Sequence, residues 1–369
     1  MSSPTAPEAQ NESELHRLVL LDDLKNGGAV RILRASPGLR ILRVDHADVA
    51  NDQRNLLDLA MKDAAIRSVL VDLANHAFVA YMLKDGVTSF VRRSYIKNLW
   101  HQVRDGRFQV DRHGLVYRLD EPLAGLVARH LIVVFSSMAG KIRTSSLMRH
   151  FEQNFSTIQK YLPAGTAVLR VADFGGVVGG YYMNSYGAPD TEQHVQGLIA
   201  EIATRLGIGH DDVVLYGASK GGSAALFHGV LGRYPVVVAD PIVADEHYIK
   251  VFKDSHFTVG VFPEDKKEKF SRLSSSVDVK GLPPVAILCS RQSPQFPYIT
   301  SVIEEPLRSH IGLFDSHHVD IKTHPDVSPK TLNLAVTLLN MQFYKLPIPA
   351  GMHVIDEVKH RKDTGSRAL

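Results

Sequence analysis

The stretch "DDVVLYGASKGGSAALFHG", residues 211–229, decides how the rest of the chain is interpreted. Its apolar run at 213–216 stops at a glycine, a serine follows two residues later, and two more glycines lead into small residues. This order predicts a strand, a tight bend and a helix. The bend matches G-x-S-x-G, the pattern in which a serine projects from a sharp turn between strand and helix. Ser219 is therefore either a nucleophile or part of a packing turn.

The residues around Ser219 fit the physical needs of a nucleophile. A serine presented at the top of a strand takes a strained backbone, and its neighbours must be small because strand and helix approach closely there. Gly217 and Gly221 meet that need, and Gly222 adds further room. The backbone N–H of Lys220, at the start of the helix, then points to where an oxyanion would form. We therefore interpret Ser219 as a nucleophile on an elbow formed by residues 217–221.

The segments that flank this elbow predict the fold class. From about residue 106 onward, apolar strand-like runs alternate with helical segments, which is typical of βαβ units. Strands that are apolar throughout indicate a parallel sheet that is covered on both faces. We predict an α/β fold with a mostly parallel sheet and helices on both faces, preceded by a small α+β unit. Ligands of such sheets bind at the C-terminal ends of the strands, where Ser219 is expected.

Composition shifts along the chain predict four segments. Residues 1–15 are rich in Ser, Pro, Glu and Asn, which is typical of a disordered tail. Residues 16–105 form the small α+β unit, called the N-terminal unit below. Residues 106–348 form the domain with the mostly parallel sheet, and the polar residues 349–369 are expected to be a flexible C-terminal tail. No chemistry is evident in the N-terminal unit.

Three apolar runs give local predictions that the structure can test. Within the N-terminal unit, residues 29–35 ("AVRILRA") and 68–73 ("SVLVDL") are interpreted as strands. Near the end of the large domain, residues 318–325 ("HVDIKTHP") are interpreted as a strand that leads to His324.

Overall composition excludes several classes of protein. The chain has 369 residues, a net charge of +3 and no dense basic stripe, so nucleic-acid binding has little support. A single cysteine, Cys289, excludes an internal disulfide and suits a reducing compartment. The start of the chain lacks the features of a signal peptide, and no apolar run approaches the ~18 residues of a membrane helix. We expect a cytoplasmic protein without a membrane span.

A serine nucleophile needs a base, and His324 is the expected one. In this architecture the order along the chain is serine, acid, histidine, with the histidine after the last strand. His324 follows the predicted final strand, precedes a proline, and is followed by a helix predicted to start at Ser328 or Pro329. His317 and His318 are the alternatives.

The acid that would orient His324 is less clear from the sequence. The loop after the strand "PPVAILCS" is the usual place, but "RQSPQFPYIT" holds no carboxylate. Asp240 follows the next strand after the elbow helix and is the preferred candidate. A Ser–His dyad oriented by Gln292 or a backbone carbonyl stays open. The weaker acid candidates are Asp245, Asp326, Glu304 and Glu305.

Two backbone N–H groups are expected to form the oxyanion hole. One is that of Lys220, directly after the nucleophile. The second normally comes from the loop after the third strand, where the sequence reads "VVFSSMAGK". There the N–H of Met138 is the natural donor, and Gly140 allows the loop to bend.

The loop "DFGGVVGGYYMNSYG", residues 173–187, is long and rich in glycine. It lacks the spacing of a dinucleotide-binding or P-loop motif, so no cofactor is expected. Tyr181, Tyr182 and Asn184 could stack on and hydrogen-bond a sugar-like ligand, or the loop could simply be packed. The Lys220 side chain could meet an anionic substrate or pair with a nearby carboxylate.

A metal site is the remaining alternative at this end of the sheet. His318, Asp320 and His324 fall on one face of the predicted strand. Without an HExxH motif or a cysteine pair this signal is weak, so no metal is expected.

The segment from about 106 to 348 resembles the α/β-hydrolase superfamily. Its elbow, "YGASKGGSAAL", preceded by the glycine-rich loop, is similar to that of bacterial capsular-polysaccharide biosynthesis proteins. It also looks like an accessory secretion protein linked to O-acetylation of glycan-bearing adhesins. The resemblance implies acyl chemistry on a glycan, by transfer or removal. It is specific at the elbow and vague in residues 1–105, and the missing acid after "AILCS" departs from the general pattern.

Two hypotheses of different classes follow. In the first, Ser219, His324 and Asp240 catalyse acyl transfer or hydrolysis on a small-molecule or glycan ester. In the second, a degenerate hydrolase fold binds a glycan or a protein without turnover. The absent acid and the N-terminal unit favour the second hypothesis. Protein partners are left open.

Overall fold

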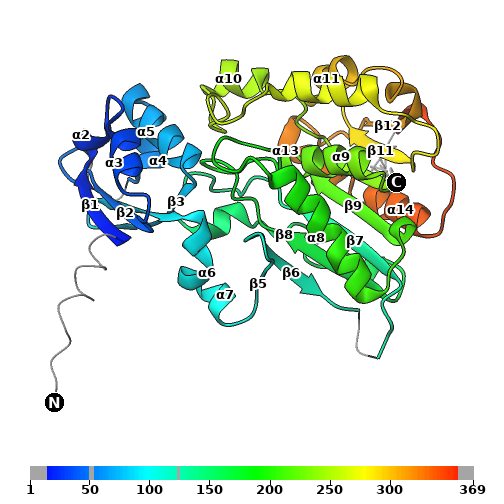
Figure 1. Ribbon diagram of the computed structural model, residues 1–369. Helices are drawn as coiled ribbons and strands as arrows, with labels where there is room; N and C mark the ends of the chain where they lie inside the picture. The colour runs from blue at the N-terminus through cyan, green and yellow to red at the C-terminus, as the bar shows by residue number, and fades with distance from the viewer. Residues whose placement is uncertain (1–14, 50–53, 123–124, 356–369) are drawn as a thin grey trace, which may run out of the picture.

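The computed structural model describes residues 15–49, 54–122 and 125–355, and shows two sheets side by side (Figure 1). The larger sheet has nine strands in the order β13-β12-β11-β10-β9-β7-β8-β6-β5. In this order, every neighbouring pair from β13 through β7 to β8 is parallel, whereas β5/β6 and β6/β8 are antiparallel. Its strands are β5 (Gln109–Val110), β6 (Val116–Asp120), β7 (His130–Phe135), β8 (Thr166–Val171), β9 (Val213–Ala218), β10 (Val236–Ala239), β11 (Val285–Cys289), β12 (Ile311–Ser316) and β13 (Gly351–Ile355).

Helices cover both faces of this sheet, which confirms the predicted fold class. The central strands are buried throughout, so alternate side chains enter two different apolar cores. One core packs against α8 (Thr191–Leu206), α9 (Lys220–Gly232), α11 (Lys266–Ser276) and α12 (Phe296–Val302). The opposite core packs against α14 (Leu332–Phe343). The shorter helices α10 (Glu246–Phe252) and α13 (His324–Lys330) follow β10 and β12.

The smaller sheet has four strands in the order β1-β2-β4-β3. β1 and β2 are parallel, and β4 pairs antiparallel with both β2 and β3. The strands are β1 (His16–Leu20), β2 (Ile41–Asp45), β3 (Phe78–Lys84) and β4 (Val87–Arg92). Around and after them lie α2 (Leu21–Leu24), α3 (Gly28–Ala35), α4 (Leu56–Leu59), α5 (Ala64–Asn75), α6 (Ile96–Leu99) and α7 (His101–Arg104).

Two of the strands predicted in this region are wrong. Residues 29–35 lie in α3, and residues 68–73 lie in α5. In α5 the buried side chains are Ile66, Val69, Leu70 and Leu73, which recur at helical spacing on one face. The packing of that face overrides the strand preference of the β-branched residues.

Predictions near the C-terminus also need correction. Residues 351–355 form the edge strand β13, which pairs in parallel with β12, so the predicted flexible tail is wrong there. Residues 318–325 are not a strand, because β12 ends at Ser316 and α13 begins at His324. The remaining tail residues, 356–369, and the predicted disordered residues 1–14 lie outside the described residues.

Residues from later parts of the chain join the cores on both faces of the small sheet. One face joins a core that includes Val177 and Val178 of the glycine-rich loop and Phe257. The other face joins a core with Trp100 and Phe151. Because alternate residues of β2 to β4 enter different cores, both faces of the small sheet depend on packing by later parts of the chain.

Arg149 links the two parts of the chain by hydrogen bonds. Its guanidinium donates to the carbonyls of Ala80 in β3, at 2.7 Å, and of Val177 in the glycine-rich loop, at 3.1 Å. The side chain is only 2% exposed, and burial lowers the pKa of Arg149 to about 9. A buried guanidinium is tolerated here because carbonyl oxygens accept hydrogen bonds from its N–H groups.

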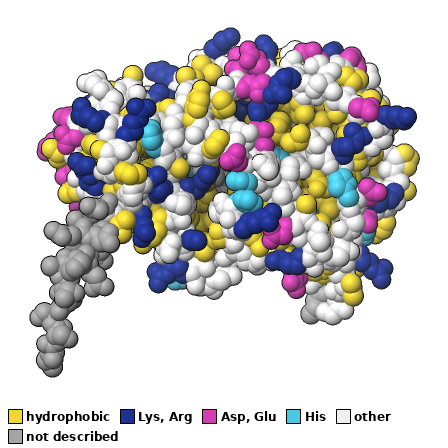
Figure 2. All heavy atoms as spheres, viewed as in Figure 1, with side chains coloured by type: hydrophobic (Ala, Val, Ile, Leu, Met, Phe, Trp, Pro, Cys, Tyr) yellow, Lys and Arg dark blue, Asp and Glu magenta, His cyan; other side chains and the backbone are white. Residues whose placement is uncertain are grey.

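The surface carries interleaved charges. Figure 2 shows one face of the molecule, on which basic and acidic side chains are interspersed with hydrophobic ones, in keeping with the small net charge. Within the described ranges, none of the helices has both the length and the apolar character needed to cross a bilayer.

His228, within α9, is a buried and neutral imidazole. Its Nδ1 accepts from the Gln196 amide at 3.1 Å, and its Nε2 donates to the carbonyl of Tyr182 at 2.9 Å. Burial lowers the pKa of His228 to about 4. In the unfolded chain a histidine has a pKa of about 6.5. As the pH falls below that value, the unfolded chain binds a proton at this residue that the folded chain does not bind.

We expect this histidine to make the fold sensitive to acid. Between pH 7 and pH 5, His228 should account for a loss of about 2 kcal/mol in the free energy of unfolding. The His228→Gln variant should lose correspondingly less over this range, as measured by urea unfolding at each pH. The control His16→Gln alters an exposed imidazole of β1 and should keep the wild-type slope. An unchanged slope in His228→Gln would contradict this account.

Candidate active site

The elbow has the strained geometry that the sequence predicts. Ser219 lies between the end of β9 and the start of α9, with φ 55° and ψ −122°. Its N–H donates to the carbonyl of Ala239 at 2.9 Å. A Cβ at Gly217 would lie 2.0 Å from the Gly221 carbonyl oxygen, and one at Gly221 only 2.3 Å from that of Phe135. Both glycines are therefore required by close approach of the backbones.

His324 lies within hydrogen-bond distance of the elbow serine. The distance between its Nε2 and Ser219 Oγ is 2.7 Å. It is the first residue of α13, which begins at a capping box formed by Thr323 and Asp326. The sequence analysis predicted His324 at the end of a strand, before a helix starting at Ser328 or Pro329, whereas in the structure it is the first residue of α13.

Asp240 lies on the opposite side of the His324 imidazole from Ser219. Its Oδ2 lies 2.6 Å from His324 Nδ1, and the carboxylate is 1% exposed. It follows β10 directly and has φ 46°, a left-handed backbone held by its N–H bond to the Leu288 carbonyl at 2.7 Å. The Ser293 hydroxyl donates to the same oxygen at 2.5 Å. The structure thus brings Ser219, His324 and Asp240 together.

The other acid candidates have different partners. Asp245 pairs with Lys266 at 2.5 Å, and Asp326 caps α13. Glu304 and Glu305 accept from the hydroxyls of neighbouring serines, Ser271 and Ser309. The loop "RQSPQFPYIT" contributes neither a carboxylate nor Gln292 to the imidazole, but it supplies the serine that holds Asp240.

A cavity of about 410 Å³ opens over these residues. Met138, whose N–H the sequence analysis predicts as an oxyanion donor, lines this cavity. The loop is fixed by Asn154, whose amide oxygen accepts from the Ser137 N–H at 2.7 Å. Lys220 is the first residue of α9, so its N–H has no acceptor within the helix. The lining residues are Ser137, Met138, Ala139, Gly140, Asn154, Ala218, Ser219, Ala239, Asp240, Tyr248, His256, His324, Pro325, Ser328 and Pro329.

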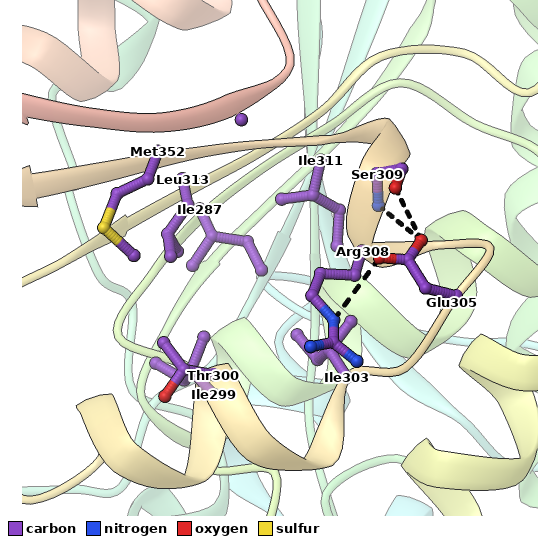
Figure 3. Close-up of a pocket in the computed structure, with 11 residues that line it drawn as sticks. Ile287, Ile299, Thr300, Ile303, Glu305, Arg308, Ser309, Ile311, Leu313 and Met352 are labelled. Atoms are coloured by element: carbon purple, nitrogen blue, oxygen red, sulfur yellow. Dashed lines mark hydrogen bonds and ion pairs between the residues drawn. The ribbon is translucent and has the colours of Figure 1, made fainter.

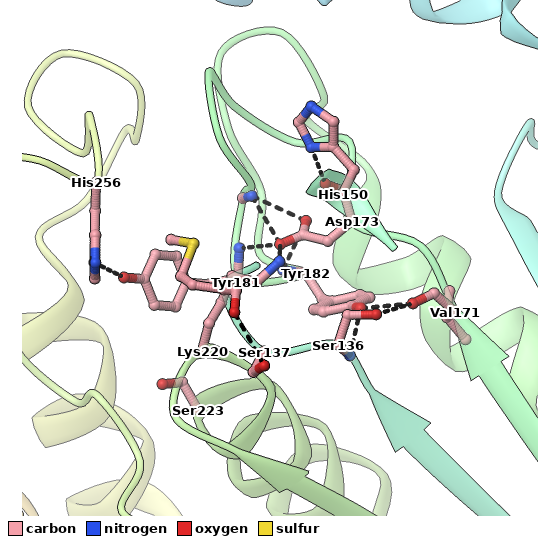
Figure 4. Close-up of polar contacts among 12 residues, drawn as sticks. Ser136, Ser137, His150, Val171, Asp173, Tyr181, Tyr182, Lys220, Ser223 and His256 are labelled. Carbon is pink, nitrogen blue, oxygen red and sulfur yellow. Dashed lines mark hydrogen bonds and ion pairs between the residues drawn. The ribbon is translucent and has the colours of Figure 1, made fainter. Parts of the chain in front are cut away.

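The residues proposed to stack on a sugar do not line this cavity. Tyr181 and Tyr182 are 0% and 1% exposed, so neither ring offers a face to a ligand. The Tyr182 hydroxyl donates to the Val171 carbonyl and accepts from the Ser136 N–H, which fixes the start of the oxyanion loop (Figure 4). Asn184 exchanges hydrogen bonds with Glu192 at the start of α8. Tyr181 and Tyr182 therefore lie within the core, whereas Asn184 is half-buried beside α8.

Lys220 pairs with a carboxylate, one of the two roles that the sequence left open. Its Nζ lies 2.8 Å from Asp173 Oδ2, and the two side chains are 0% and 1% exposed. Asp173 also accepts from the N–H groups of Gly180 and Tyr181 (Figure 4). The glycine-rich loop is therefore wrapped around one buried carboxylate that is neutralised from the elbow. A Cβ at Gly179 would lie only 2.9 Å from both Asp173 Oδ2 and Lys220 Nζ.

The weak metal pattern of the sequence does not assemble. Asp320 pairs with Lys330 at 3.1 Å, and His324 is engaged by Asp240. Across the described ranges, no group of three or more His, Cys, Asp or Glu side chains is arranged to hold a metal ion.

A second cavity, of about 440 Å³, lies between α12 and the strands β11 to β13. Figure 3 shows aliphatic side chains lining it, with Arg308, Glu305 and Ser309 paired together at one end. It presents no histidine, so an acyl-transfer reaction has no base there. The cavity over Ser219 is therefore the candidate active site.

Several residues of this site were missed by sequence reasoning. Asn154, Tyr248, His256 and Ser293 lie in segments without a recognisable motif. Asp173 did carry a signal, because it opens the glycine-rich loop directly after a buried strand. A carboxylate in that position could have been expected to meet the lysine of the elbow.

Comparisons with known proteins add little to this geometry. No protein-family model and no curated protein matches the chain. Among solved structures it is similar to carboxyl esterase 2 of the fungus Tuber melanosporum, at 13% identity over 65% of this chain and 88% of that one (TM-score 0.44). It is also similar to the capsule O-acetyltransferase of Neisseria meningitidis serogroup A, at 15% identity over 67% and 85% (TM-score 0.38). Likeness at this level carries no argument about the chemistry, which rests on the site itself.

We expect the buried pair under the elbow to be essential for stability. Lys220→Met leaves Asp173 charged and buried without its partner, which should lower the free energy of unfolding by about 3–5 kcal/mol. Adding Asp173→Asn should recover part of the loss, because the uncompensated charge is then gone. Urea unfolding measures both changes.

The matched control for this pair is Lys330→Met. It breaks the Lys330–Asp320 pair, whose side chains are 37% and 61% exposed, and should cost about 0–1 kcal/mol. Equal losses at the two sites would show that the Lys220–Asp173 pair is not special.

Proposed function

We propose that this protein is a serine-dependent enzyme that hydrolyses or transfers an acyl ester. The observation that carries the proposal is the row of hydrogen bonds from Ser219 Oγ to His324 Nε2, and from His324 Nδ1 to Asp240 Oδ2. A strained elbow serine, an imidazole and a buried carboxylate in this order have the geometry of a catalytic triad.

The first half of the reaction makes an acyl-enzyme. Ser219 Oγ attacks the ester carbonyl while His324 Nε2 takes its proton. Asp240 accepts a hydrogen bond from Nδ1–H, which holds the required tautomer and stabilises the imidazolium. His324 then gives the proton to the oxygen of the leaving alcohol, and the acyl group remains on Ser219.

Two N–H groups would stabilise the negative charge that develops on the carbonyl oxygen. Lys220 is the first residue of α9, and Met138 lies on the loop that lines the same cavity. Donors that are fixed in advance are effective because they need no reorganisation during the reaction. The bonds of Ser137 to Asn154 and of Ser136 to Tyr182 supply that rigidity.

The acyl-enzyme is resolved by water or by another hydroxyl. The resemblance of the elbow to capsular-polysaccharide biosynthesis proteins supports a glycan or another polar acyl ester as substrate. The alternative, a degenerate fold that only binds, was favoured in the sequence by the apparent lack of an acid and by the N-terminal unit. The contact between Asp240 and His324 removes the first of these reasons.

The nucleophile and base should act as one unit. Ser219→Ala should lower the hydrolysis of short-chain p-nitrophenyl esters by ~10⁴ to 10⁶-fold, and His324→Ala should lose about as much. The double variant should lose little more, because members of one catalytic unit are not additive. Labelling by a fluorophosphonate probe should require both residues. Turnover that persists in Ser219→Ala would rule out the assignment.

Asp240 should matter through the tautomer of the imidazole rather than through stability. Asp240→Asn keeps the shape but should lower kcat by ~10⁴, because Nδ1 then no longer faces a charged acceptor. The control Asp320→Asn changes a carboxylate that is 61% exposed and should leave kcat unchanged. If Asp240→Asn retains full activity, the site works as a dyad.

A further inference from the structure

His256 is a polar residue of the cavity that the triad does not use. It lines the same cavity as Ser219 and His324 and is 6% exposed. It belongs to the connection between α10 and α11, which is far from both residues in sequence. A second histidine that lines this cavity needs a chemical explanation.

The backbone around His256 is unusually strained. Lys253, Asp254 and Phe257 have φ values of 51°, 51° and 53°, in the left-handed region that non-glycine residues seldom occupy. Three such residues within five positions persist only where the surroundings fix them, and such strain gathers at functional sites. The strain points to a fixed position for the histidine between them.

The N-terminal unit fixes this segment. Arg67 of α5 donates to the carbonyls of Lys253 and Asp254, each at 2.9 Å, and its guanidinium lies 4.5 Å from the centroid of the Phe257 ring. Phe257 is buried in the core shared with the small sheet. Asn75, at the end of α5, donates to the carbonyl of Gly260 at 2.9 Å.

The ring of His256 is oriented by Tyr181. The Tyr181 hydroxyl lies 2.8 Å from Nδ1, as Figure 4 shows. Among the described residues this hydroxyl has no other hydrogen-bond partner, and its side chain is fully buried. If Nδ1 carried the proton, the phenolic O–H would be a buried donor without an acceptor. Tyr181 therefore donates to Nδ1, and Nε2 carries the proton.

The surroundings also keep this imidazole neutral. Burial lowers the pKa of His256 to about 3, and the ammonium of Lys266, which lies 3.2 Å from the centroid of the Tyr181 ring, acts in the same direction. The other charged or titratable groups that lower it are His324, Lys220 and His247. His256 is therefore an uncharged N–H donor at neutral pH.

The position of His256 relates it to the leaving alcohol. Its ring stacks on Tyr248 at 3.8 Å between centroids, and the Tyr248 ring meets His324 edge to face at 6.4 Å. The oxyanion donors come instead from the start of α9 and from the loop after β7. His324 must reach the oxygen of the leaving alcohol to protonate it. His256 therefore lies on the alcohol side of the scissile bond.

We propose that His256 is a substrate-binding residue whose Nε2–H donates to a second oxygen of the alcohol portion of the ester. The enzyme would then prefer esters of polyhydroxy alcohols, such as sugars, over esters of alcohols without a further oxygen. An N–H group donates a hydrogen bond to an oxygen acceptor, whereas it can neither accept a proton nor coordinate a metal. This proposal rests on the proposed function of Ser219.

The test compares glycerol monoacetate, whose alcohol portion has further hydroxyls, with phenyl acetate, whose alcohol portion has none. In His256→Ala, the ratio of kcat/KM for glycerol monoacetate to that for phenyl acetate should fall about tenfold, mainly through KM. His256→Gln retains an N–H donor and should recover most of the ratio. Tyr181→Phe removes the hydroxyl that fixes the tautomer of His256, and it should lower the ratio by less than His256→Ala does. The control His247→Gln should not change it.

Fluorophosphonate labelling of Ser219 separates the possible failures. If the unaltered protein is not labelled, the proposed function is overturned and the role of His256 falls with it. If the protein is labelled but the ratio is unchanged in His256→Ala, only the role of His256 is overturned. Should the alanine variant fail to fold, an unchanged ratio in Tyr181→Phe overturns the proposal instead.

Discussion

The structure depends on one ion pair that no solvent reaches, between Lys220 of the elbow and Asp173 of the glycine-rich loop. The carboxylate gathers the N–H groups of that loop, and the loop in turn places two buried tyrosines. Tyr182 holds the start of the oxyanion loop, and Tyr181 holds His256. The lysine next to Ser219 therefore organises both walls of the cavity without lining it.

The sequence revealed the parts of the site that follow from rules of the fold. Gly217 and Gly221 are required by contacts between backbones, so the elbow could be predicted. Asp240 could be proposed because parallel strands end at the same edge of a sheet. The partners that hold these groups could not, since Ser293 and Asn154 act through long-range contacts that leave no local pattern.

The errors of the sequence interpretation share a physical cause. For Tyr181 and Tyr182 the sequence left two roles open, contact with a ligand or packing of the loop, and the structure shows that the loop is part of the core. Likewise, α3 and α5 were taken for strands because short apolar runs of either kind look alike until their packing is known. In each case the deciding interaction came from a distant part of the chain.

Residues of the large domain join the cores on both faces of the small sheet, and helix α5 holds the segment around His256. A part added to an enzyme usually has its own core and can be lost or replaced on its own. Here the described residues of the N-terminal unit share their cores with the large domain, and they hold the segment that carries His256 to the cavity over Ser219. A change in either part that disturbs these shared cores would therefore be felt in the other.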